Sequence, residues 1–293
     1  MNDRSLSDYL AATIPWTSSA GTGPVLRGRR TALRTPMLHF LHGNGFCGGV
    51  YWPFLRHFIG DYGLFCHDLE GHGGSDAPAR YSGTAAIIAR VPLVIADQRL
   101  PQPLVGIGHS FGAAVTLAVA ARHPGLFRAL VLLDPILLPP RDWLAVKLAS
   151  WLRRNPMAES ARRRRERWSS RAQALEHLRD RGIYRNWRSE ALEAFVDHAT
   201  RDDGSGARAL CCPRDLEAAI FENPVYPWRL PPVPCPILFV HGEHSYPFFP
   251  AAARRMMHRH PHITLRTLPG GHCFMQEDPD TAADTVSRFL RAL

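Results

Sequence analysis

Lysine is nearly absent from this sequence. Lys147 is the single lysine among 35 lysine and arginine residues, so arginine carries almost all of the formal net charge of +9. A charge of this size can attract an anionic partner, but no nucleic-acid-binding motif accompanies it. We therefore attribute the charge to an arginine-rich composition and predict no nucleic-acid partner.

Long apolar runs and paired cysteines are missing as well. No run approaches the length needed to span a bilayer, and residues 1–6 lack the basic and then apolar pattern of a secretory signal. The six cysteines do not have zinc-site spacing, and Cys211 and Cys212 are adjacent. We therefore predict free thiols, no metal site, no integral membrane span and a cytoplasmic location.

The sequence does contain a regular alternation of strand-like and helix-like stretches. Apolar strand patterns cover residues 37–41, 63–67, 104–108, 129–133, 236–240 and 263–268, and helical patterns cover residues 51–59, 84–98, 115–122, 251–260 and 279–293. This alternation predicts an α/β fold with a doubly wound, mostly parallel sheet. Residues 25–33 predict an early edge strand, and the polar residues 1–24 predict an irregular arm.

Between residues 139 and 234 the pattern changes, because strand patterns disappear and helical stretches rich in Arg, Trp, Leu and Ala replace them. We predict a core of residues 1–138 and 233–293 that is interrupted by a helical cap of residues 139–232. The densest charge run of the cap, residues 162–167, predicts a solvated helix face. Binding of a membrane surface or an anionic ligand is the alternative for this run.

The motif around which the chain is organised is Gly108-x-Ser110-x-Gly112. It follows an apolar strand and precedes an Ala- and Val-rich helix, which is the context of a nucleophile elbow. Such a turn holds the serine in a strained backbone conformation, and side chains two residues to either side would crowd it. This context favours a nucleophilic Ser110 over a serine that only makes a tight turn.

A serine hydroxyl becomes a nucleophile only with a base and with donors for the oxyanion. His272 is the candidate base among the 15 histidines, because it follows a strand end and two glycines and comes late in the chain. The candidate oxyanion donors are the backbone N–H groups of Phe111, next to the nucleophile, and of Asn44, in a glycine-rich loop after a strand.

These motifs resemble those of α/β-hydrolase-fold enzymes, in the same order. The resemblance rests on the loop at 42–45, the segment at 68–75, the elbow and the loop before His272. It covers residues 36–135 and 233–293 and implies a triad of serine, histidine and an acid. Asn44 is similar to a residue of the family's dehalogenases. However, dehalogenases and epoxide hydrolases of this family use Asp as the nucleophile, so Ser110 argues against both reactions.

The acid is the position where the sequence departs from the family pattern. The family's usual Asp position, after the strand at 236–240, is occupied here by Ser245. Two carboxylates remain: Asp134, at the end of the preceding strand, and Glu243, in the same turn as Ser245. We favour Asp134, because a triad is recognised by geometry rather than by sequence position, and keep Glu243 as the alternative.

Aromatic residues near the expected site predict an apolar substrate pocket. We assign to this pocket the side chains of Phe46, His109, Trp143, Phe248 and Phe274. The pocket is expected to bind a small molecule.

The sequence thus predicts a serine hydrolase of carboxylesterase type, and it does not identify the specific substrate. It would cleave a carboxylic ester, thioester or lactone of a small to medium apolar substrate through an acyl-enzyme on Ser110, without metal or organic cofactor. A C–C hydrolase or an aminopeptidase with the same triad is one alternative, and a non-catalytic binding protein on a hydrolase scaffold is another. The oligomeric state stays open.

Overall fold

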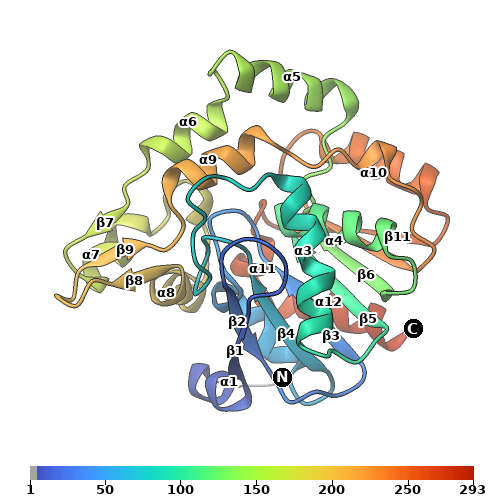
Figure 1. The fold of residues 1–293 in the computed structure, drawn as a ribbon, viewed down its shortest axis with the longest axis horizontal. Coiled ribbons are helices and arrows are strands. Elements are labelled where there is room, and N and C mark those ends of the chain that lie inside the picture. Colours follow the sequence, from blue (N-terminus) through green and yellow to red (C-terminus); the bar gives the residue numbers. More distant parts are fainter. Residues whose placement is uncertain (1–4) are drawn as a thin grey trace.

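A computed structural model describes residues 5–293 of the chain. Its centre is an eight-stranded sheet with the order β1-β2-β4-β3-β5-β6-β10-β11 (Figure 1). The strands are β1 (Ile14–Ser18), β2 (Leu26–Arg30), β3 (Met37–Leu41), β4 (Gly63–Asp68), β5 (Leu104–His109), β6 (Phe127–Leu133), β10 (Ile237–Gly242) and β11 (Ile263–Leu268). In this order, each pair of neighbours from β4 to β11 is parallel. The pairs β1–β2 and β2–β4 are antiparallel. The predicted α/β fold with a mostly parallel sheet is confirmed.

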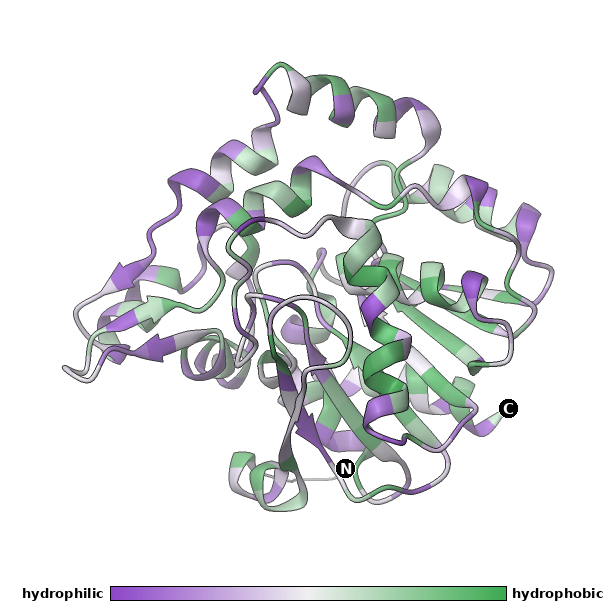
Figure 2. Ribbon diagram, in the orientation of Figure 1, coloured by the Kyte–Doolittle hydropathy of each residue, from purple (hydrophilic) through white to green (hydrophobic). Residues whose placement is uncertain are grey.

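Helices cover both faces of this sheet. One face carries α3 (Thr84–Asp97), α4 (Phe111–Arg122) and α10 (Phe249–Arg259), and the other carries α2 (Trp52–Leu55), α11 (Phe274–Glu277) and α12 (Pro279–Arg291). Within β3, Leu38 and Phe40 belong to one buried cluster and Met37 and Leu41 to the other. Successive side chains point to opposite faces, so a strand covered on both sides is apolar throughout. Figure 2 shows this in the hydrophobic strands and in α4.

The N-terminal segment differs from the expected irregular arm. Residues 1–4 of that arm lie outside the described residues, residues 6–18 form α1 (Leu6–Ala12) and β1, and residues 19–24 are irregular as expected. A capping box between Ser5 and Asp8 begins α1. In β1, the Trp16 ring stacks on Phe65 with centroids 4.5 Å apart, and its indole N–H donates to the Cys66 carbonyl over 3.0 Å. Burial of this tryptophan therefore stabilises β1, which pairs outside β2 and takes the edge position that was predicted for residues 25–33.

The segment between β6 and β10 contains helices, as expected, but also strands. Its helices are α5 (Pro140–Trp151), α6 (Pro156–Arg163), α7 (Arg171–Leu178), α8 (Ser189–His198) and α9 (Arg214–Glu222), with single 3-10 turns at Gly182–Tyr184 and Pro227–Arg229. The prediction that strands are absent here was wrong. A small antiparallel sheet joins β7 (Arg167–Trp168), β9 (Arg208–Leu210) and β8 (Thr200–Asp202). Strands of two or three residues are too short for an alternating pattern to reveal them.

We refer to residues 134–236 as the inserted segment. In Figure 1, its helices α5, α6 and α9 lie above the sheet, and α7, α8 and the small antiparallel sheet lie to the left. Division of the chain into a core and a cap at residues 138/139 and 232/233 stays a prediction. Over residues 5–293, no helix combines the length and the apolar character that crossing a membrane requires.

Two histidines lie side by side inside the sheet. Nε2 of His39, on β3, is 3.3 Å from Nδ1 of His67, on β4, and both side chains are buried. Their other ring nitrogens, Nδ1 of His39 and Nε2 of His67, have no hydrogen-bond partner within residues 5–293. Burial lowers the pKa of His39 to about 3 and lowers the pKa of His67 well below its usual range. Both rings are therefore neutral at neutral pH.

His39 should make folding sensitive to acid. Its pKa is about 3 when folded and 6.5 in its ordinary state, so the unfolded chain binds the extra proton as the pH falls below about 6.5. Above that pH His39 is neutral in both states and does not lower the free energy of unfolding. As the pH falls from about 6.5 toward about 3, protonation of the unfolded chain lowers this free energy progressively. We expect the wild type to lose up to about 1.4 kcal/mol per pH unit more than His39→Gln. Urea unfolding at about pH 7 and about pH 5 measures this difference.

His123→Gln provides the matched control, because it makes the same replacement at a histidine that is exposed. A gap between His39→Gln and wild type that does not vary with pH would contradict the prediction.

Candidate active site

Ser110 lies at the sharp turn between β5 and α4. Its φ of 55° and ψ of −118° are unusual for a residue with a side chain. The two flanking glycines are sterically required. A Cβ atom on Gly108 would lie 2.6 Å from the backbone of Ala113, and one on Gly112 would lie 2.3 Å from the Leu41 carbonyl oxygen. The turn thus presents the serine hydroxyl at the N-terminus of α4, where the helix dipole favours negative charge.

His272 reaches this hydroxyl from the loop between β11 and α11. Its Nε2 is 2.9 Å from Oγ of Ser110, within hydrogen-bond distance. The two residues are far apart in the chain, and they meet because β5 and β11 are parallel strands of one sheet that end at the same edge. An imidazole nitrogen at this distance is able to take a proton from the hydroxyl.

Asp134 holds the other side of the imidazole. It follows β6, is fully buried, and its Oδ2 accepts a hydrogen bond from Nδ1 of His272. The same oxygen accepts from the Ser245 hydroxyl, and Oδ1 accepts from the backbone N–H of Gly242 over 2.9 Å. Three donors therefore satisfy a carboxylate that burial would otherwise penalise.

The alternative acid, Glu243, is not brought to the imidazole. Its side chain is exposed, and its backbone N–H donates to the Leu268 carbonyl over 2.8 Å. Ser245, at the position where the family usually has Asp, contacts Asp134 instead of His272. Of the two carboxylates that sequence reasoning left open, Asp134 is the one that is hydrogen-bonded to His272.

A second hydrogen-bonded chain runs through His109, the residue before Ser110. The backbone N–H of Gly43 donates to the Tyr51 hydroxyl over 3.1 Å, and that hydroxyl lies 2.6 Å from Nδ1 of His109. Nε2 of His109 lies 2.9 Å from the carbonyl oxygen of His272. Because burial lowers the pKa of His109 well below its usual range, the ring is neutral, accepts at Nδ1 and donates at Nε2.

This chain ties the glycine-rich loop, the elbow and the His272 loop together. Sequence reasoning missed Tyr51, because a tyrosine in a helical stretch carries no motif. It assigned His109 to the substrate pocket, but both ring nitrogens of His109 are engaged in holding these loops.

The two predicted oxyanion donors are both free of protein acceptors. Within residues 5–293, the backbone N–H groups of Asn44 and Phe111 make no hydrogen bond. The Asn44 side chain is held by a 2.9 Å bond from its amide nitrogen to the Glu217 carbonyl. His72 accepts from the N–H of Gly45 over 3.0 Å. Neighbouring contacts thus fix the loop while leaving its Asn44 amide available.

Comparison with known proteins identifies the family of the chain. Residues 40–285 match the sequence pattern of the alpha/beta hydrolase family. The chain belongs to the alpha/beta hydrolase family. "Lipase LipV" of Mycobacterium tuberculosis is 39% identical over 87 residues, which cover 30% of this chain and 33% of that protein. "Type I acyl-CoA thioesterase mpaH" of Penicillium brevicompactum is 34% identical over 106 residues, which cover 36% of this chain and 23% of that protein.

Similarity to these curated relatives is thus confined to a third or less of their length. Solved structures resemble the chain over more of its length. That of "E-2-(Acetamidomethylene)succinate Hydrolase" superimposes with a TM-score of 0.77 at 20% identity and covers 95% of this chain and 99% of the other. At this identity the likeness concerns the fold. The shared fold extends along nearly the whole chain.

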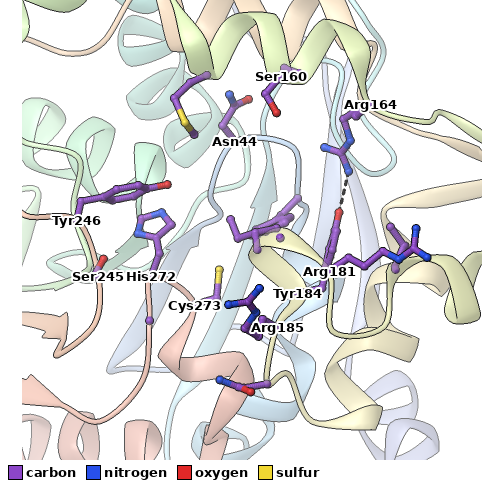
Figure 3. A pocket seen from close by; sticks show the side chains of 18 of the residues that line it. Asn44, Ser160, Arg164, Arg181, Tyr184, Arg185, Ser245, Tyr246, His272 and Cys273 are labelled. Atoms are coloured by element: carbon purple, nitrogen blue, oxygen red, sulfur yellow. Dashed lines mark hydrogen bonds between the residues drawn. The ribbon is translucent and has the colours of Figure 1, made fainter.

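A cavity of about 1060 Å³ opens beside His272 in this alpha/beta hydrolase. Core loops contribute Asn44, Phe46 and residues 244–247 and 270–273, and the inserted segment contributes α6, the end of α7 and the turn at 181–186. In Figure 3, Tyr246, Ser245 and His272 lie on the left and Arg164, Tyr184 and Arg181 on the right. The inserted segment therefore forms the wall of the cavity away from the imidazole.

The predicted substrate pocket needs correction. Among its five residues, Phe46 lines this cavity, and four do not: His109, Trp143, Phe248 and Phe274. The Trp143 indole donates to the Pro224 carbonyl within the inserted segment over 3.1 Å. Phe248 stacks on Phe249 with centroids 4.7 Å apart, and Phe274 is buried in the core. Sequence position near a loop did not reveal which of these rings pack inward.

The arginine run at 162–167 also differs from the single solvated helix face that was expected. Arg162 and Arg163 do end α6 and form surface ion pairs. Arg164 turns toward the cavity instead, where its guanidinium donates to the Glu217 carboxylate over 2.7 Å and to the Tyr184 hydroxyl over 2.7 Å. Because α6 ends at Arg163 and Arg164 has extended backbone, Arg164 does not continue the helix face.

Tyr51 offers a test of the second hydrogen-bonded chain. Tyr51→Phe removes the hydroxyl that lies between Gly43 and His109, leaving a buried N–H and a buried ring nitrogen unpaired. We expect the free energy of unfolding to fall by about 1–3 kcal/mol, measured by urea unfolding. Tyr62→Phe is the control, because Tyr62 lies half-buried in the loop before β4 and its hydroxyl has no hydrogen bond within residues 5–293. Equal stability of the two variants would contradict a stabilising role for the hydrogen bonds of the Tyr51 hydroxyl.

Proposed function

We propose that this alpha/beta hydrolase is a serine hydrolase that cleaves carboxylic esters or thioesters through an acyl-enzyme on Ser110. One observation carries the proposal: Oγ of Ser110 lies 2.9 Å from Nε2 of His272, whose Nδ1 is hydrogen-bonded to the buried Asp134. This is the relation of nucleophile, base and orienting acid that acyl transfer requires.

In the first half of the reaction, Ser110 Oγ attacks the substrate carbonyl carbon as its proton passes to Nε2 of His272. The carbonyl π electrons move to oxygen, and the amides of Asn44 and Phe111 donate to the resulting oxyanion. The tetrahedral intermediate then collapses. The leaving alcohol or thiol takes the proton from Nε2, and the acyl group stays on Ser110.

In the second half, a water molecule replaces the leaving group. His272 takes a proton from this water as its oxygen attacks the acyl carbon, and returns the proton to Oγ of Ser110 as the acid departs. Asp134 keeps its charge throughout, because its role is to fix the imidazole tautomer and to stabilise the imidazolium.

Our choice of the type of bond that is cleaved rests on the names of the relatives. One is named a lipase and another an acyl-CoA thioesterase, which favours an ester or thioester. The same three side chains would also serve a lactonase, a C–C hydrolase or an aminopeptidase, and a substrate panel distinguishes these. A cytoplasmic location stays a prediction.

A non-catalytic binding protein on this scaffold is the competing function. Its support was the serine at position 245. The contact of Ser245 with Asp134 weakens that support, because the serine assists another acid rather than marking the loss of one.

Covalent labelling tests whether Ser110 is activated. A fluorophosphonate probe forms a bond between its phosphorus and an activated serine oxygen and releases fluoride. We expect mass spectrometry to find the adduct on Ser110 and expect His272→Ala to abolish it, since the base is then missing. His258→Ala, at an exposed histidine on α10, should retain the adduct. Absence of the adduct in the wild-type protein would favour the binding protein instead.

The acid is tested by a pair of isosteric replacements. Asp134→Asn should lower kcat on a p-nitrophenyl ester by about 10⁴-fold, because the amide favours the wrong tautomer of His272. Glu243→Gln should leave kcat almost unchanged, since this side chain is exposed. The opposite ranking would transfer the role to Glu243.

A further inference from the structure

The cavity beside His272 is richer in arginine than the predicted apolar pocket. Its lining includes four arginines, all from the inserted segment, and two carboxylates: Arg164, Arg165, Arg181, Arg185, Glu217 and Glu277. A concave surface with an excess of one charge concentrates ligands of the opposite charge. What matters is therefore which of these arginines are neutralised by the protein itself.

Both carboxylates are already engaged. Glu217 receives two hydrogen bonds from Nη1 of Arg164, over 2.7 and 2.8 Å. Oε1 of Glu277 accepts from the backbone N–H of Gly271 over 2.9 Å. Arg165 is held by neutral oxygens, the carbonyl of Arg167 and Oε1 of Gln173.

Arg181 and Arg185 have no acidic partner. Nη1 of Arg181 approaches Nδ1 of His177 at 3.5 Å, and the Arg185 side chain makes no hydrogen bond or ion pair within residues 5–293. Arg188, which lies close in the chain but outside the cavity lining, differs from them. Arg188 contacts both Asp278 and Asp280. The guanidinium groups of Arg181 and Arg185 line the cavity without a carboxylate partner, so they are available to a ligand there.

The turn that carries these two arginines is anchored. They flank the 3-10 turn Gly182–Tyr184, whose Tyr184 is buried and accepts a hydrogen bond from Arg164 over 2.7 Å. His177, on the same wall, has its pKa lowered by burial and then by Arg181 and Arg165. Figure 3 shows Arg185 near Cys273, between the imidazole side and the Tyr184 side of the cavity.

We propose that Arg181 and Arg185 bind an anionic group of the substrate, a carboxylate or a phosphate, while its scissile carbonyl lies at Ser110. Guanidinium groups suit both anions, because their planar donors match two oxygens at once. This inference rests on the proposed serine hydrolase and names its substrate class. It replaces the fully apolar substrate expected from the sequence with an amphipathic one, because Phe46 and Leu178 also line the cavity.

Paired substrates test the proposal. The carboxylate arm compares the p-nitrophenyl monoester of a dicarboxylic acid with a methyl-terminated p-nitrophenyl ester of equal chain length. The phosphate arm compares an acyl-CoA thioester with the N-acetylcysteamine thioester of the same acyl group. We expect kcat/KM to favour the anionic member of at least one pair, and the preference to shrink as NaCl rises from about 0.05 M to about 0.5 M.

The variants separate binding of the anion from structural damage. Arg181→Gln combined with Arg185→Gln should lower kcat/KM for the preferred anionic substrate by about 10-fold or more and leave its neutral partner unchanged. Arg179→Gln is the matched control, because Arg179 is exposed in the same segment and lies outside the cavity lining. An equal loss on anionic and neutral substrates, or no preference in either arm, would overturn the proposal.

A binding measurement keeps this test separate from the proposed function. With Ser110→Ala, calorimetry gives Kd for the dicarboxylate monoester, the acyl-CoA and their neutral partners without turnover. Tighter binding of an anionic member that the double arginine variant abolishes supports the proposal even if no ester is hydrolysed. Hydrolysis without any preference in turnover or Kd leaves the serine hydrolase standing and refutes the anion site.

Discussion

A single buried carboxylate determines how the candidate site is assembled. Asp134 is fully enclosed, so its charge is tolerable only with hydrogen-bond donors around it. Those three donors come from two places: the end of β10 and the turn after it, through Gly242 and Ser245, and the loop after β11, through His272. The need to satisfy this one group therefore brings together the ends of β6, β10 and β11, and the histidine arrives at Ser110 as a consequence.

The core of the fold could be predicted from the sequence because its signals are local. Continuous apolar runs mark strands buried on both faces, and the glycines at 108 and 112 mark a turn that excludes side chains. Ser110, His272 and Asp134 stand at ends of such strands, so topology alone brings them to one edge of the sheet. The N-terminal strand escaped prediction, because its pairing with β2 and the burial of Trp16 against Phe65 are tertiary contacts that leave no pattern in residues 14–18.

The cavity could not be predicted in the same way. Its walls belong to a segment without strong periodicity, and which side chains face inward depends on where short elements end. Arg164 faces Glu217 because α6 stops at Arg163, whereas Phe274 packs into the core although it follows His272 closely. Neither orientation can be predicted from the sequence of the few residues around it. The chemistry of the substrate is therefore encoded in tertiary contacts, unlike the chemistry of the nucleophile.

Ser245 has a consequence for how such a site changes during evolution. A carboxylate at 245 would lie against Asp134, and two close anions in a buried site repel each other so strongly that one of them would be protonated. Moving the acid from β6 to the turn after β10 by single substitutions therefore passes through a protein with two competing acids or with none. The Ser245 hydroxyl, which now donates to Asp134, therefore favours retention of the acid at position 134. We expect descendants of this chain to change positions 134 and 245 together or to change neither.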